Sequence, residues 1–155
     1  MEIVNWVLFL SITVFGSGCV TGSGVGSFPI RRLEKGAHSG VVEPRQVVIK
    51  DKADWQRLWR EHSSQSQPQQ PIPEVDFAKE MAIFVAMGQQ FSGGFAIEIE
   101  KMERSEGRLK IFVRHMAPGP GAMVSQALST PFEIVAVPRA ELRPEFVEIK
   151  DRRRE

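Results

Sequence analysis

Few side chains in this chain are of the types and spacing that catalysis or metal binding requires. The three histidines, His38, His62 and His115, lie far apart, and no two have a metal-ligand spacing such as His-x-x-x-His. Ser92 precedes two glycines but does not stand in the Gly-x-Ser-x-Gly elbow of a serine hydrolase. Nothing in the sequence indicates that Asp76 and His115 approach Ser92 as a triad would require. We therefore expect a protein that is not an enzyme and has no metal site and no cofactor.

Two further patterns also lack what their chemistry requires. The Gly-Pro-Gly at 119–121 is not followed by Gly-Lys-Ser/Thr and opens no predicted helix, which argues against a phosphate loop. Glu98 and Glu100 alternate along one predicted strand, which places both carboxylates on its solvated face. The formal net charge is only +1, and basic and aromatic residues do not interleave as on a base-stacking surface. We therefore expect no nucleic-acid partner.

Two loops rich in glycine and proline are the strongest candidates for a binding site. The first, Phe-Ser-Gly-Gly-Phe at 91–95, lies between an apolar run at 82–88 and an alternating run at 95–100. Its two glycines allow positive φ and close backbone approach. The second, at 117–122, is rigid and exposed by its Pro/Gly chemistry. Shaped loops on a β scaffold more often bind than catalyse. The predicted partner-binding residues are Phe91, Ser92, Gly93, Gly94, Phe95, Pro118, Gly119, Pro120 and Gly121.

The elements that carry these loops are mostly strands. Apolar runs or period-two alternation predict strands at 27–35, 46–51, 82–87, 95–102, 108–115, 131–138 and 145–150. The pair flanking the turn at 103–107 reads as a hairpin. Pro29 argues that the first strand lies at a sheet edge.

One helix is predicted where the hydrophobic period changes. Trp55, Leu58, Trp59 and His62 follow at i, i+3, i+4 and i+7, and Asp51 suits the N-cap. Docking on the sheet explains the two tryptophans better than ligand binding does. A polar, proline-rich loop follows at 63–73. The fold expected is α+β: a mostly antiparallel β-sheet or small β-sandwich with one amphipathic helix packed on it.

The first residues indicate export. The apolar stretch 3–15 is shorter than the roughly 20 residues that span a bilayer, but it suits a signal peptide. Three small residues precede Cys19, the one cysteine, as in the bacterial lipoprotein signal, whose cysteine becomes the lipidated first residue. Gly16 and the lack of Lys or Arg before 3–15 depart from that pattern, so an ordinary cleaved signal or an uncleaved anchor stays open.

The expected organisation follows from this reading. Residues 1–18 are a signal peptide, 19–27 are a flexible tether after the lipid-attachment residue Cys19, and 28–155 are a single domain. A protein of this kind is exported to the bacterial cell envelope and held on a membrane, periplasmic or cell-surface, by its lipid anchor.

The C-terminal half resembles the PrcB-like family, named for a subunit of a bacterial surface protease complex. The resemblance rests on the ordered set of Val75 to Met81, Met87-Gly88, Phe91 to Ile99, Ala117 to Val124 and Gln126 to Val135. Family members have a Thr/Ser-Gly-Gly-Tyr loop, a Pro-Gly loop and a late Pro-Tyr strand.

Two aromatic positions depart from that pattern, because Phe95 and Phe132 stand where tyrosine is common. A Trp-x-x-Leu-Trp helix, here Trp55 to Trp59, is a frequent companion, so that the resemblance covers about Val47 to Pro138. It implies an exported, often lipid-anchored, non-catalytic domain that binds a protein partner and stabilises or assists a surface protease complex.

A second likeness points to the chagasin-type inhibitors of cysteine proteases. Those proteins present three loops, and Ser92–Phe95, Gly119–Gly121 and Arg143–Phe146 show similar motifs in the same order. This likeness implies a loop-presenting protease inhibitor. A structural envelope protein, with no partner that depends on the loops, is a third possibility.

Overall fold

A computed structural model describes residues 27–149 of the chain. The elements are β1 (Arg31–Gly36), β2 (Arg45–Ile49), α1 (Lys52–His62), η1 (Ser63–Gln65), β3 (Glu80–Ala86), β4 (Ala96–Ser105), β5 (Arg108–Met116), β6 (Phe132–Pro138) and β7 (Arg143–Ile149). The predicted signal peptide, Cys19 and all of the tether except Ser27 lie outside the described residues. Ser27 forms an isolated antiparallel bridge with Glu103. No helix within 27–149 is long and apolar enough to cross a membrane.

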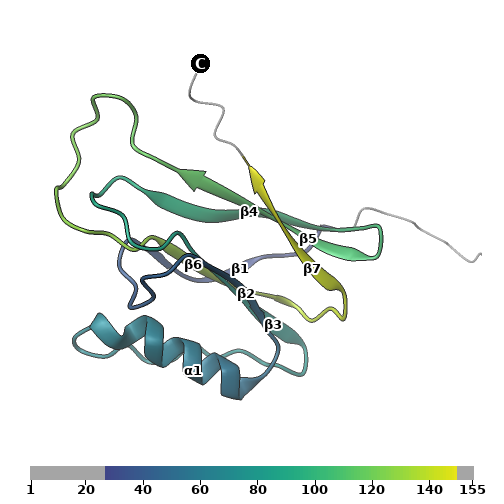
Figure 1. Ribbon diagram of the computed structural model, residues 1–155. Helices are drawn as coiled ribbons and strands as arrows, with labels where there is room; N and C mark the ends of the chain where they lie inside the picture. Colours follow the sequence, from purple (N-terminus) through teal and green to yellow (C-terminus); the bar gives the residue numbers. More distant parts are fainter. Residues whose placement is uncertain (1–26, 150–155) are drawn as a thin grey trace, which may run out of the picture.

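The strands form two sheets that pack face to face. One sheet has the order β1-β6-β3-β2 and is antiparallel throughout. The other has the order β4-β5-β7, in which β4 and β5 form an antiparallel hairpin and β7 runs parallel to β5. In Figure 1 the three-stranded sheet lies above the four-stranded sheet, and α1 covers the far face of the latter. The predicted fold, a mostly antiparallel β-sheet or small β-sandwich with one packed helix, is confirmed, and the two sheets make it a sandwich.

The central strands β3 and β6 read as apolar runs because both of their faces are buried. Successive side chains of a strand point to opposite faces. On β3, Met81, Ile83 and Val85 therefore face the other sheet, where they pack with residues of β4 and β5. Phe84 and its neighbours Ala82 and Ala86 face α1. Alternate residues of one sequence run thus build two separate cores.

The helix forms as its spacing predicts. The side chain of Asp51 accepts a hydrogen bond from Asp54 N at 2.9 Å, which caps the first turn. The predicted apolar face is buried against the four-stranded sheet. The indole of Trp55 donates to Pro73 O at 3.1 Å and that of Trp59 to Gln70 O at 3.2 Å. These bonds tie the proline-rich loop to the helix, so docking is the role of both tryptophans.

Some element boundaries differ from the prediction. The strand β4 continues to Ser105 and β5 starts at Arg108, so the hairpin turn has two residues where five were expected. The first strand starts at Arg31 and lies at an edge, as predicted. A register shift between Ile99 and Lys101 interrupts the alternation of β4 at Glu100. Glu98 pairs with Lys35, and Glu100 pairs with Arg114.

Candidate partner-binding surface

The two predicted binding loops meet at one end of the sandwich. The segment between β3 and β4 and the segment between β5 and β6 lie side by side at the left of Figure 1. Gln90 and Ser129 pair through both backbone N–H groups, at 2.7 and 3.0 Å. Gly93 N donates to Ser125 O at 2.9 Å, and the Ser129 hydroxyl donates to Ser92 O at 2.7 Å. Residues 125 and 129 thus fasten the second loop to the first.

Glycine at position 94 is required by this packing. Gly94 has φ +85°, and a Cβ there would stand 2.7 Å from Val124 and 3.1 Å from Pro118. A Cβ at Gly93 would likewise stand 2.5 Å from the Ser125 hydroxyl oxygen. The two glycines therefore allow close backbone approach, as the sequence predicts, but the approach is to the neighbouring loop of the same chain.

The tip of the second loop stands away from the rest of the protein. A Cβ added at Gly119 or Gly121 would meet nothing within 4 Å. Ala122 N donates to Gly119 O at 3.1 Å, which closes a turn at the tip. Pro120 is exposed. Of the predicted residues, 91–95 and Pro118 therefore lie where the loops converge, and 119–121 form a free tip.

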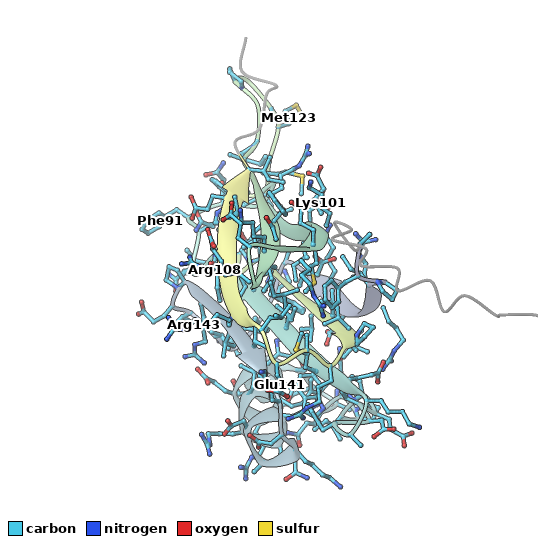
Figure 2. The ribbon with its side chains drawn as sticks, turned by 90° about the vertical axis from the view of Figure 1, so that its right-hand side faces the viewer. Phe91, Lys101, Arg108, Met123, Glu141 and Arg143 are labelled. Atoms are coloured by element: carbon cyan, nitrogen blue, oxygen red, sulfur yellow. The ribbon has the colours of Figure 1, made fainter. Side chains whose placement is uncertain are left out.

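Large apolar side chains are exposed at the same end. Phe91 is 85% exposed and Met123 fully exposed, and Leu128 and Val42 are also exposed. Val42 belongs to a third segment, whose carbonyl accepts a hydrogen bond from Gln89 N at 2.9 Å. Figure 2 shows Phe91 and Met123 pointing away from the body of the protein. We call Val42, Phe91, Met123 and Leu128 the apolar loop surface.

Sequence reasoning identified only Phe91 among these four. The sequence signal for the others was an apolar residue in a segment without strand or helix period. Among residues 27–149, five large hydrophobic residues are exposed, and only Ile72 lies outside this surface. Val42, Phe91 and Leu128 lie at or beside the backbone hydrogen bonds that join the three segments, and exposed apolar side chains from neighbouring segments mark an interaction site better than a single exposed residue does.

The serine, histidine and aspartate considered for a triad are not hydrogen-bonded to one another. The Ser92 hydroxyl donates to Gly93 O at 3.2 Å. The Asp76 carboxylate accepts from Ala78 N at 3.1 Å. His115 Nε2 is buried and has no hydrogen-bond partner. Each side chain thus has a different environment from the one that a triad requires.

A different set of triad-type residues does come together, and the sequence did not reveal it. His62 Nδ1 lies 2.9 Å from the Ser39 hydroxyl, and His62 Nε2 lies 3.1 Å from a Glu34 carboxylate oxygen. However, Ser39 is only 1% exposed, and its hydroxyl oxygen accepts from Val41 N at 3.1 Å. The centroid of the imidazole ring lies 4.3 Å from the centroid of the Phe132 ring. Because the hydroxyl faces the interior, this network holds β1, the following loop and the end of α1 together.

Charged side chains on the two sheets form ion pairs with side chains of other strands. The hydrogen bond from Lys35 lowers the pKa of Glu98 and joins β1 of one sheet to β4 of the other. The guanidinium of Arg31 likewise lowers the pKa of Glu80. Within residues 27–149, no three His, Cys, Asp or Glu side chains are placed to hold a metal ion.

The expected three-loop arrangement of chagasin-type inhibitors is not formed. Arg143–Phe146 belong to β7, where Arg143 pairs with Arg108 at the start of β5. The loop at 117–131 follows the other end of β5, after Met116. At the usual rise per strand residue, Arg108 and Met116 are about 25 Å apart. Arg143 also lies far from Met123 in Figure 2. The parallel pairing of β7, which the sequence did not indicate, separates this motif from the two loops.

Residues 81–138 match the family model described as PrcB C-terminal. This segment of the chain is thus similar to the PrcB C-terminal family. The match includes β3 to β6 and both loops of the candidate site, while α1 lies outside it. No curated protein and no solved structure matches the chain. The resemblance expected from the ordered motifs is thus confirmed for this segment.

Proposed function

We propose that this PrcB-like domain binds a protein partner through the apolar loop surface and thereby stabilises or assists a surface protease complex. The exposure of Phe91, Met123, Leu128 and Val42 at one end carries the proposal. A few anchor residues supply most of the binding energy at protein interfaces, and aromatic residues and methionine are enriched there. The family match supports an association with a protease.

The loops are suited to presenting these anchors. Their bases are fixed by the Gln90–Ser129 pairing and by the close contact of Gly94 with Val124. A surface that is ordered before binding loses less conformational entropy when the partner docks. The second loop's free tip at 119–121 extends the reach of the surface beyond the sheet.

In this proposal the protein is non-catalytic and exported, and a lipid on Cys19 attaches it to a membrane of the cell envelope. The apolar stretch and the small residues before Cys19 support this part. Replacing Cys19 with Ala should move the protein from the membrane fraction to the soluble fraction of the envelope. Mass spectrometry of the wild-type N-terminus should then find the acylated cysteine.

The partner-binding surface is tested by pull-down from envelope extract with the wild-type protein and two variants. Phe91→Ala combined with Met123→Ala should abolish enrichment of a protease subunit, since truncating an anchor costs about 2 kcal/mol or more. Ile72→Ala removes an exposed apolar side chain outside the surface and serves as the matched control. Equal enrichment by all three baits, with the folds intact by urea unfolding, would refute the surface.

The activity of the captured protease then defines the role. An accessory subunit should raise the protease's activity or slow its thermal inactivation. Inhibition would instead favour a protease inhibitor, although one that does not use Arg143–Phe146 together with the loops. A structural envelope protein would leave the protease's activity and half-life unchanged.

A further inference from the structure

Three of the four edge strands carry features that prevent pairing with another chain. The strand β1 has a register shift between Arg32 and Glu34. The strand β4 has a similar shift at Glu100, and β7 contains Pro144. Bulges and prolines are the usual means by which sheet edges avoid strand addition. The fourth edge strand, β2, has neither.

The strand β2 offers a regular edge. It pairs with β3 residue for residue from Arg45↔Ala86 to Ile49↔Ala82, with no register shift. Among the described strands it has no neighbour on its other side. Its sequence Val47-Val48-Ile49 consists of β-branched residues, which favour the extended conformation. The outer edge therefore presents backbone groups in the geometry of a strand.

A hollow of about 200 Å³ adjoins this edge, between β2 and α1. Its apolar lining consists of Val47, Val48, Ile49 and Leu58. Its charged residues are already paired: Arg45 donates to both carboxylate oxygens of Glu61, at 2.7 and 2.9 Å.

The second charged pair of the hollow is equally local. Arg57 lies 3.1 Å from Asp54, one turn away on the same helix. Both cations of the hollow thus have a carboxylate of the same chain beside them. A charged side chain entering the hollow would compete with these pairs, whereas an aliphatic one would bury apolar surface.

We propose that β2 binds an extended, uncharged segment of a partner polypeptide by strand addition, with an aliphatic side chain in the hollow beside α1. Backbone hydrogen bonds would hold the segment, and the hollow would select its alternate side chains. This site is separate from the apolar loop surface and does not depend on it. The two sites are nevertheless close in space, because Pro44, before β2, lies against Gly88, which precedes the first loop.

The test uses the full-length protein and a capped synthetic peptide of alternating threonine and valine, seven residues long. At a peptide concentration about tenfold above its Kd, amide hydrogen exchange of residues 45–49 should slow about tenfold. The same peptide with every backbone nitrogen methylated cannot form a β ladder and should have no effect. Val47→Lys, which places a charge in the hollow, should weaken binding at least tenfold, whereas Ile72→Lys should not.

Three results would overturn the proposal. The methylated peptide could protect residues 45–49 equally well, which would exclude backbone pairing. The protection could fall on residues 88–95 and 117–130, which would place the peptide on the apolar loop surface. Protection of residues 45–49 that rises with protein concentration in the absence of peptide would assign the edge to a second copy of this chain. The wild-type exchange data decide the question even if Val47→Lys fails to fold.

Discussion

Glu133 offers the sharpest test of how the two sheets are held together. This residue is on the central strand β6, and its side chain is fully buried on the side that faces the other sheet. One carboxylate oxygen accepts from Arg32 Nε at 2.7 Å, and the other accepts from the backbone N–H of Ile99. Ile99 lies beside the bulge of β4, where the ladder of the strand is irregular. The Glu133 carboxylate therefore supplies the acceptor that the buried N–H group of Ile99 needs.

The substitution Glu133→Gln separates these two interactions. Glutamine has one oxygen, and the amide nitrogen that replaces the other would face a donor. If Ile99 N–H loses its acceptor, a buried donor is left unsatisfied, which costs about 1–3 kcal/mol. If Arg32 loses its acceptor, a hydrogen bond to a charged group is lost, which costs about 1.5–3 kcal/mol. We expect the free energy of unfolding to fall by about 1–3 kcal/mol in either case.

Glu98→Gln is the matched control, because it is the same chemical change at a partly exposed carboxylate. Glu98 pairs with Lys35 at 2.7 Å, and a glutamine oxygen can still accept that hydrogen bond. The free energy of unfolding of Glu98→Gln should fall by less than about 1 kcal/mol. Urea unfolding, monitored by the fluorescence of the buried Trp55 and Trp59, measures the free energy of unfolding of both variants. Losses within about 0.5 kcal/mol of each other would refute the role assigned to the buried carboxylate.

Three further predictions concern the helix cap, a loop glycine and pH. Asp51→Ala should lower the free energy of unfolding by about 1 kcal/mol and Asp51→Asn by much less, since asparagine also caps; equal losses in urea unfolding would contradict the cap. Gly88→Ala should cost about 1–3 kcal/mol, because φ is +78° and a Cβ would stand 2.8 Å from Pro44; a loss below about 0.5 kcal/mol would contradict this reasoning. Arg31 lowers the folded-state pKa of Glu80, so the pair stabilises the fold above the ordinary carboxyl pKa, and this contribution is lost as the pH falls through the lowered one. The stability gap between wild type and Glu80→Gln should therefore stay constant from about pH 7 to 5 and close below about pH 4, whereas a gap that widens in acid would rule out this linkage.

Local patterns in the sequence were sufficient to predict the secondary structure. The helix with its Asp51 cap depends on hydrogen bonds and side-chain spacing within a few residues. The period of two in β4 and β5 and the apolar runs of β3 and β6 record how many faces of each strand are buried. The two loops were predicted for the same reason, since glycine and proline limit the backbone locally.

What the sequence by itself determined is therefore the set of elements, the mostly antiparallel fold class and the place of the two loops. The tertiary structure decided which strands are neighbours: the parallel pairing of β7 with β5, the contact of Glu133 with Ile99 and the network of Ser39 with His62. It also decided that Met123 and Leu128 would be exposed at the same end of the sandwich as Phe91. These features join residues that are distant in sequence, and pairing of distant segments depends on how the whole chain buries its apolar surface. Short-range periodicity carries no information about that choice.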